Sequence, residues 1–446
     1  MREKKTMVIA LAMVLYCASG ASAQEEPSPL ADVIQGINAM WVLLTAVLVF
    51  FMQAGFGMLE AGFIRAKNTC NILTKNFLDF CMASLGFFLI GYGLMFGAGN
   101  AFCGTTGWCL AGEDAVTSGV PTHVFWLFQA AFCGAAATIV AGGMAERMKF
   151  GAYLVYSLVI STLVYPIVGH WIWGGGWLYG LGFADFAGST VVHTVGGCAA
   201  LVGTIILGPR HGKFNPDGSA NAMAAHNIPI ASLGVFILWF GWFGFNAGST
   251  LAVGDGLLIA RVAINTNLAA ALGGIAAMLT VWKVYGKPDL SMAMNGALAG
   301  LVAVTAPCAF IDPWAAMVIG AIGGVLVVVG VGLLDKFGVD DPVGAFPVHG
   351  LCGIWGTLSV GIFGQQALLG GELGGLVYGG GVKMLGIQAV GSASAVLFVL
   401  VTMGIAFSVI KATMGLRVSH EEELRGLDIS EHGMESYGGF QIFSNV

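Results

Sequence analysis

The sequence predicts an all-α polytopic membrane protein with eleven transmembrane helices. Hydrophobic residues make up 57% of the chain and charged residues only 9%, and the mean hydropathy is +0.85, whereas soluble domains carry roughly one quarter charged residues. Apolar stretches long enough for the ~20 residues of a spanning helix occur eleven times along the chain. The 69 glycines are spread through these stretches, as is typical of transmembrane helices that pack closely.

The N-terminal segment has the pattern of a cleaved secretory signal peptide. Arg2, Lys4 and Lys5 precede an apolar run at 7–15, and small residues at 21–23 offer a cleavage site. Its removal takes away three bases and one acid, which changes the net charge from −6 to −8 and argues against nucleic acid as a partner.

The remaining chain divides into a membrane domain and a polar tail. The predicted divisions are a signal peptide at 1–23, a transmembrane domain at 24–411 and a cytoplasmic tail at 412–446. The predicted spans are 38–64, 72–97, 122–145, 150–172, 189–208, 226–247, 258–282, 292–311, 314–334, 348–367 and 385–411. A cleaved signal peptide and eleven crossings predict an external N-terminus and a cytoplasmic C-terminus.

The distribution of basic residues agrees with this topology, because cytoplasmic loops carry an excess of Lys and Arg. Thirteen basic residues fall inside: Arg65, Lys67, Lys75, Arg147, Lys149, Arg210, Lys213, Lys283, Lys287, Lys336, Lys411, Arg417 and Arg425. Only Arg261 and Lys383 fall outside. One miscounted helix would scramble this asymmetry.

Two histidines, His193 and His349, occur in matching apolar segments. Each follows an aspartate by eight residues, Asp185 and Asp341 respectively, and precedes a glycine by four. The two segments belong to the fifth and tenth predicted helices, so a five-helix unit (helices 1–5 and 6–10) occurs twice, inverted in the bilayer, followed by an eleventh helix. Inverted repeats are typical of transporters, and ionisable groups within a membrane usually mark functional sites.

Other interpretations of the two histidines stay open at this point. A lone histidine in a membrane helix can simply hydrogen-bond a neighbour, and two can ligate haem. No Walker motif, metal-ligand cluster or soluble catalytic domain is visible in the sequence, so we expect no cofactor, no metal and no enzymatic activity.

The nine cysteines fall into two groups. Most lie in or beside apolar segments, where they pack as small side chains. Cys103 and Cys109 share a loop that we place on the oxidising side of the membrane, so a disulfide between them is a hypothesis.

Aromatic residues flank the outer halves of the predicted helices. Phe128 and Phe132 are four residues apart on one helix face, Trp173 precedes three glycines, and Phe245 is followed by Ser249. Such a stripe can be ordinary packing, or it can form a vestibule in which an ammonium-like ion over ring faces gains ~0.5 to 2 kcal/mol.

Five long and specific motifs are spread over nearly the whole chain. They are Glu60-Ala-Gly-Phe-Ile-Arg-Ala-Lys-Asn68, the Asp185–His193 segment, Gly241-Trp-Phe-Gly-Phe-Asn-Ala-Gly-Ser249, Asn295-Gly-Ala-Leu-Ala-Gly-Leu-Val-Ala-Val-Thr305 and Gly415-Leu-Arg-Val. In these motifs the chain resembles the ammonium transporter (Amt/Mep/Rh) family, on its bacterial Amt branch.

The resemblance implies a role for each candidate residue. Trp173, Phe132 and Ser249 would line an outer ammonium recruitment site, to which we add Phe128 from the aromatic stripe. Phe132 with Phe245 would form a stacked gate, His193 with His349 would line the pore as a proton relay, and Asp185 would act by orientation and electrostatics. The resemblance further implies a homotrimer in the inner (cytoplasmic) membrane of a bacterium.

The tail admits two interpretations. By composition it is a solvated extension, whereas the resemblance implies that it packs under the pore and responds to a PII signalling protein. Met434 stands where many relatives carry an acidic residue. Beside transport we weigh two other functions, namely an ammonium sensor with little flux and a bis-histidine redox protein.

Overall fold

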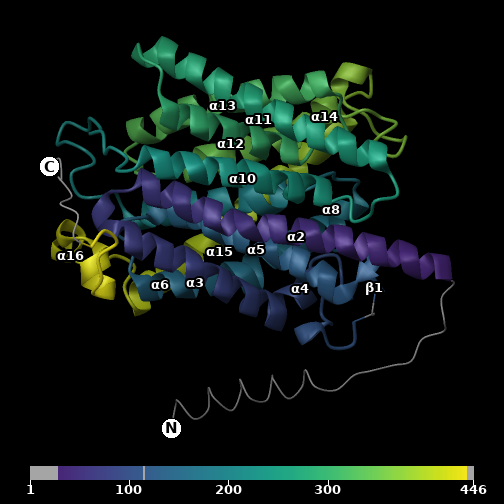
Figure 1. Cartoon of the computed structure of the whole chain (residues 1–446), viewed down its shortest axis with the longest axis horizontal. Helices are drawn as coiled ribbons and strands as arrows, with labels where there is room; N and C mark the ends of the chain where they lie inside the picture. The colour runs from purple at the N-terminus through teal and green to yellow at the C-terminus, as the bar shows by residue number, and fades with distance from the viewer. Residues whose placement is uncertain (1–28, 114–115, 439–446) are drawn as a thin grey trace, which may run out of the picture.

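The computed structural model describes residues 29–113 and 116–438. The predicted signal peptide lies outside the described residues. Nearly parallel helices form a bundle, with α16 at one end and β1 at the other (Figure 1). We call the end that carries α16 the tail end and the opposite one the far end.

The first half of the bundle is built from short and long helices around one small hairpin. Its elements are α2 (Pro29–Phe63), η1 (Ala66–Asn68), α3 (Thr69–Gly86), η2 (Phe87–Gly91), α4 (Tyr92–Phe96), η3 (Trp108–Leu110), β1 (Val116–Thr117), β2 (Val120–Pro121), α5 (Thr122–Met144), α6 (Phe150–Val159), η4 (Ile160–Val164), α7 (Tyr165–Ile172), α8 (Trp177–Gly180), η5 (Ser189–Thr194) and α9 (Val195–Leu207). The two strands pair antiparallel.

The second half of the chain is helical throughout its regular elements and ends in the tail. Its elements are α10 (Ile228–Gly248), α11 (Gly256–Tyr285), α12 (Leu290–Thr305), α13 (Pro313–Lys336), η6 (Phe346–Leu351), α14 (Cys352–Phe363), η7 (Leu376–Tyr378), α15 (Lys383–Thr413), α16 (His420–Arg425) and η8 (Asp428–His432). The segments η2, η4, η5, η6 and η8 are π-helical turns, which often occur at functional sites.

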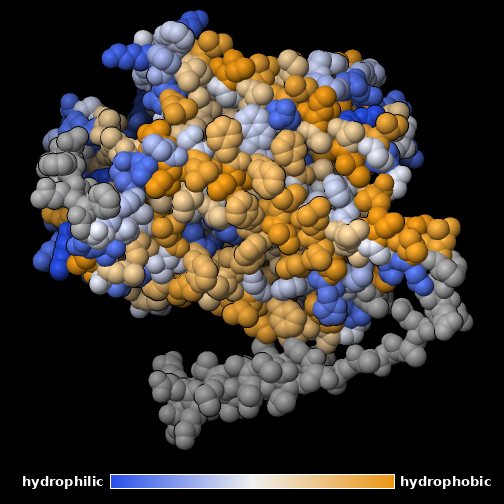
Figure 2. Space-filling model, in the orientation of Figure 1, coloured by the Kyte–Doolittle hydropathy of each residue, from blue (hydrophilic) through white to orange (hydrophobic). Residues whose placement is uncertain are grey.

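Ten helical spans among the described residues are long and apolar enough to cross a membrane, and α12 is a shorter apolar helix of 16 residues. Each of these segments overlaps one of the predicted spans, and the chain is a multi-pass, helical membrane protein with about ten or eleven membrane-competent helices. An apolar surface between two hydrophilic ends agrees with this (Figure 2).

Three predicted span boundaries are wrong by several residues. The first helix begins at Pro29 rather than at 38, because the apolar residues before 38 also continue the helix. The eighth ends at Thr305 rather than at 311, since a turn through Pro307 follows it, and the tenth ends at Phe363, because Gly364 is extended.

The helices α2 and α10, the first of each predicted repeat, lie side by side (Figure 1). Their contact is reciprocal: Gly55 faces Leu238 of α10, and Gly234 faces Leu59 of α2, with a Cβ at Gly234 falling 2.4 Å from the Leu59 nitrogen. Any larger residue at Gly234 would separate the two backbones. Close helix contact therefore explains these glycines.

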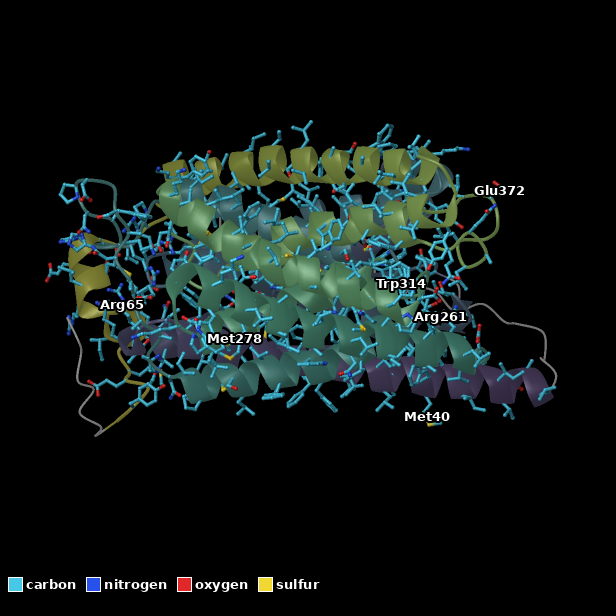
Figure 3. The ribbon with its side chains drawn as sticks, turned by 90° about the horizontal axis from the view of Figure 1, so that it is seen from above. Met40, Arg65, Arg261, Met278, Trp314 and Glu372 are labelled. Atoms are coloured by element: carbon cyan, nitrogen blue, oxygen red, sulfur yellow. The ribbon has the colours of Figure 1, made fainter. Side chains whose placement is uncertain are left out.

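Basic side chains gather at the tail end, where Arg65 lies, whereas Arg261 and Glu372 lie toward the far end (Figure 3). The tail-end bases are held by specific partners. Lys75 donates to the Met148 carbonyl at 2.6 Å, and Lys67 donates to the Leu424 carbonyl at 2.6 Å. The predicted asymmetry of charge is thus a real asymmetry between the two ends of the bundle.

The hypothesis of a Cys103–Cys109 disulfide is wrong, because Cys103 is a free thiol. Cys109 lies on the short turn η3, with its sulfur 3.9 Å from the Leu89 carbonyl oxygen. The Cys109 side chain is buried.

Candidate functional site

The two histidines meet inside the bundle. The Nδ1 atoms of His193 and His349 are 3.1 Å apart, and their rings are stacked at an interplanar angle of 22°. Each histidine lies in a π-helical turn, η5 and η6 respectively, and both side chains are buried. The separation is that of a hydrogen bond, so one nitrogen donates and the other accepts, and no haem fits between the rings.

Two aspartates fix the turns that present these histidines. The Asp185 carboxylate accepts hydrogen bonds from the backbone N–H groups of Gly188, Ser189, Thr190 and Val191, at 2.8 to 3.0 Å. Gly188 has a φ of 111°, a conformation that favours glycine. Asp185 therefore builds the entry into η5 and contacts neither histidine ring in the described structure.

Asp341 does the same for the second histidine. Its carboxylate accepts from Gly344, Ala345 and Phe346 at 2.8 to 3.1 Å, and Gly344 also has a positive φ, of 79°. Burial raises the pKa of both Asp185 and Asp341, and the backbone N–H groups partly offset this. The matching D-x7-H patterns thus form matching structures.

A stack of aromatic rings leads from the far end to His193. Phe132 and Phe245 are stacked with centroids 4.0 Å apart, and Phe245 stacks on His193 at 5.4 Å. Both phenylalanines are fully buried. The rings of Phe132, Phe245 and His193 therefore form one continuous stack.

The other predicted vestibule residues border the same stack. Trp173 lies edge-on to Phe132 with centroids 6.2 Å apart, and its indole N–H donates to the Asp185 carbonyl at 2.7 Å. Phe128 is 4.6 Å from Phe132, centroid to centroid, and would touch a Cβ placed at Gly248. The hydroxyl of Ser249 donates to the Phe245 carbonyl at 2.9 Å, which leaves its lone pairs as acceptors.

Trp242 is a site residue that sequence reasoning missed. Its ring stacks on His193 with centroids 5.1 Å apart at an angle of 17°, and its indole N–H donates to Thr305 at 2.9 Å. The signal was present, because Trp242 stands three residues before Phe245 and therefore shares its helix face.

A small cavity lies on the other side of the histidine pair. Its walls are Phe56, Leu59, Glu60, Ile139, Asn295, Leu298, Val343, Gly344, Ala345, Val348 and His349. Glu60 belongs to α2, three residues before the end of this helix, and only 2% of its surface is exposed. The sequence indicated Glu60 and Asn295 only as members of the family motifs and predicted no role for either residue.

A network of ion pairs lies at the tail end of the bundle. Arg210 binds Glu146 at 2.6 Å and Asp340 at 2.9 Å, and Arg65 also pairs with Glu146. Burial by itself would raise the pKa of Glu146 and of Asp340, but the neighbouring guanidinium groups lower both below their ordinary values. Burial lowers the pKa of Arg147 to about 10.

The tail binds directly to this end. The Asp428 carboxylate accepts from the backbone N–H groups of Cys70 and Asn71, Glu423 accepts from the N–H of His211 at 2.6 Å, and His226 contacts the Tyr437 hydroxyl at 2.7 Å. The interpretation of the tail as a purely solvated extension is therefore wrong for the described residues.

Among the described residues, no three His, Cys, Asp or Glu side chains group as a metal site requires. A helical membrane bundle with a buried imidazole pair at the end of an aromatic path has the architecture of a membrane transporter.

Comparison with known proteins supplies the family. The profile of the Ammonium Transporter Family matches residues 40–437. The chain is 46% identical to the ammonium transporter Amt2 of Archaeoglobus fulgidus, over 97% of this chain and 95% of that protein. It is 37% identical to an ammonium transporter of Bacillus subtilis, over 90% of this chain and 98% of that one.

Solved structures agree. A structure described as a sensor Amt protein superposes with a TM-score of 0.85 at 40% identity, covering 90% of this chain and 99% of that one. Candida albicans Mep2 superposes with a TM-score of 0.82 at 29% identity, over 94% of this chain and 96% of Mep2. The chain belongs to the ammonium transporter family.

Proposed function

We propose that this protein recruits ammonium at its far end, removes a proton and conducts ammonia past the histidine pair to the tail end. The observation that carries the proposal is the 3.1 Å contact between His193 and His349 directly beneath the stacked rings of Phe132 and Phe245. In this account Trp173, Phe128, Phe132 and Ser249 bind the cation, and Phe132 and Phe245 are the gate.

The chemistry of the site separates ammonium from potassium, an ion of similar size. A bare cation in a narrow apolar passage is costly, and potassium has no proton to give up. Ammonium can lose one, and the remaining neutral ammonia crosses at a much lower electrostatic cost. Two hydrogen-bonded imidazoles can each donate and accept a proton, so His193 and His349 are suited to relay it.

The same proposal includes the topology. Bases gathered at the tail end favour placing that end in the cytoplasm, with the far end outside and the two halves as inverted repeats. The reciprocal packing of α2 and α10 supports such a two-fold relation. We further propose a homotrimer in the inner membrane, formed after removal of residues 1–23.

The tail is the proposed regulatory segment. It is held at the tail end by Asp428 and Glu423, so a PII-type protein that binds there would act next to the exit. Co-purification with PII under nitrogen sufficiency tests this, and absence of PII from the complex would contradict it.

Ammonium pulses on proteoliposomes at several pH values test the transport function. We expect a current that saturates with ammonium and is absent with potassium. A sensor with little flux is the alternative, and one similar structure is described as a sensor; ammonium binding without any flux would support this alternative and contradict transport.

A further inference from the structure

The cavity on the tail-end side of His349 contains a buried acid without a counter-ion. Glu60 and Asn295 both line it, together with His349. The Oε2 atom of Glu60 and the Oδ1 atom of Asn295 are buried and have no hydrogen-bond partner within the described residues. Buried polar groups are normally paired, so two unpaired acceptor oxygens in one cavity indicate a ligand with N–H or O–H donors.

Glu60 differs from the other acids of this end. Glu146 and Asp340 each pair with Arg210, whereas no Lys or Arg within the described residues forms an ion pair with Glu60. The charged neighbours that act on Glu60 are two further acids, Asp79 and Asp341, and the Asn76 side chain is a neutral hydrogen-bonding neighbour. The local field therefore favours a cation, which no Lys or Arg of the described residues supplies.

The amide of Asn295 is oriented for such a role. Its Nδ2 atom donates to the Val343 carbonyl at 3.1 Å, next to the Gly344 turn that Asp341 fixes. Because the nitrogen is engaged, the free Oδ1 atom remains available as an acceptor. Two acceptors of this kind, one of them an acid, match the N–H donors of ammonium.

We propose that Glu60 and Asn295 form an inner ammonium site, in which ammonia leaving the histidine pair regains a proton. This inference rests on the proposed transport function. Without a cation, Glu60 is a neutral carboxylic acid, since an unpaired buried carboxylate is costly. Ammonia accepts the carboxyl proton through its lone pair, which leaves an ammonium ion bound to the Glu60 carboxylate and to Asn295 Oδ1.

The site then returns to its starting state by releasing ammonium to the cytoplasm and taking up a proton from it. Ammonium departs to water, and the Glu60 carboxylate takes a proton from a hydronium ion, which becomes water. Atoms and charge balance over the cycle: one ammonia and one proton are consumed, and one ammonium ion is released. Glu60 contacts the substrate in this account and is therefore a catalytic residue.

Two substitutions at Glu60 separate proton exchange from packing. Glu60→Gln keeps the shape but cannot give up a proton, whereas Glu60→Asp keeps the carboxyl group but is one methylene shorter. We expect Glu60→Gln to lower the ammonium flux into proteoliposomes by about 10²-fold, the size typical of a lost general acid, and Glu60→Asp to retain more flux than Glu60→Gln. The opposite order, with Glu60→Gln equal to or better than Glu60→Asp, would overturn the proposal.

Infrared difference spectroscopy tests the site without relying on flux. Addition of ammonium chloride to the intact protein should remove a carboxylic acid C=O band and add carboxylate bands, and Glu60→Gln should abolish this change. Asp335→Asn is the control, because Asp335 pairs with Lys213 at 2.8 Å and neither lines the cavity nor acts on Glu60, and it should keep the change. A band change that persists in Glu60→Gln, or none in the wild type, would overturn the inner site. Absence of wild-type flux alone would instead count against transport.

Discussion

The two sides of the histidine pair are built alike at the backbone and differently in their side chains. Each histidine follows a turn fixed by an aspartate, Asp185 or Asp341. On the far side, aromatic rings stack against the pair, among them Phe132 and Phe245. On the tail side, a small cavity includes an acid and an amide, Glu60 and Asn295, among its lining residues.

The difference teaches how one scaffold can serve two steps. Ring faces attract a cation weakly and carry no net charge, which suits the capture and release of ammonium before it loses a proton. A carboxyl group binds a cation strongly and can supply a proton, which suits the return of ammonia to water. In the proposed mechanism, the two aspartate turns position the histidine relay between these two environments.

The largest expected effect concerns the network of ion pairs at the tail end, which differs from the uncharged aromatic stack on the other side of the histidine pair. Asp340→Asn leaves the buried Arg210 with one partner fewer, so we expect a loss of about 3 to 5 kcal/mol in stability. Thermal unfolding in detergent at pH 7 should show a clearly lower Tm than the wild type.

The pH dependence of that loss checks its cause. The pKa of Asp340 in the folded protein lies below its ordinary value, which is ~3.9. The contribution is therefore complete above pH ~4 and is lost as the pH falls toward the lowered folded pKa. The difference in Tm between wild type and Asp340→Asn should shrink below pH 4, and a constant difference would rule out an ionic origin.

The second prediction compares the two aspartate turns. Asp185→Asn and Asp341→Asn each replace one acceptor oxygen by an NH2 group, which cannot accept a hydrogen bond. Hydrogen bonds to charged groups contribute ~1.5 to 3 kcal/mol to stability. Because Asp185 accepts four bonds and Asp341 three, Asp185→Asn should lower the Tm more. An equal or reversed order would show that the two turns are not held in the same way.

The third prediction tests the aromatic side. Trp173→Ala removes a ring from the far end of the stack, so the ammonium concentration for half-maximal current should rise roughly 2- to 30-fold, corresponding to ~0.5 to 2 kcal/mol. Trp314→Ala is the control, because Trp314 is also toward the far end but packs on Phe363, outside the stack. A similar change in both variants would remove Trp173 from the binding site.

The smallest expected effect is at Ser249. Its hydroxyl already donates to the Phe245 carbonyl, so only a lone pair is left for a cation. Ser249→Ala should raise the half-maximal concentration about twofold, in line with a net hydrogen bond of ~0.5 kcal/mol. An increase larger than that of Trp173→Ala would mean that the hydroxyl, and not the ring, dominates capture.

The helices were largely predictable from the sequence, because an apolar run of sufficient length has few alternatives in a membrane. The meeting of His193 and His349 was predictable from the repeated pattern. The role of Asp185 as a backbone acceptor was not, since it depends on a glycine turn whose hydrogen bonds no spacing reveals. Trp242 could have been found from its spacing to Phe245, with which it shares a helix face. Glu60 could not, because only the tertiary packing places it in the cavity next to His349.

The disulfide hypothesis fails for a related reason. Nearness of Cys103 and Cys109 in the sequence does not determine which thiols pair, and Cys103 is a free thiol in the structure. Local sequence is a good guide where hydropathy or repetition decides the structure, and a poor one where a turn decides it.

The central claim is that ammonium loses a proton at the His193–His349 pair, so that neutral ammonia crosses the membrane. The most direct test is to record currents from proteoliposomes with the double variant His193→Ala/His349→Ala, alternating pulses of ammonium and potassium. We predict either no ammonium current or a leak that carries potassium as well as ammonium. A double variant that still passes ammonium at the wild-type level and excludes potassium would contradict the claim.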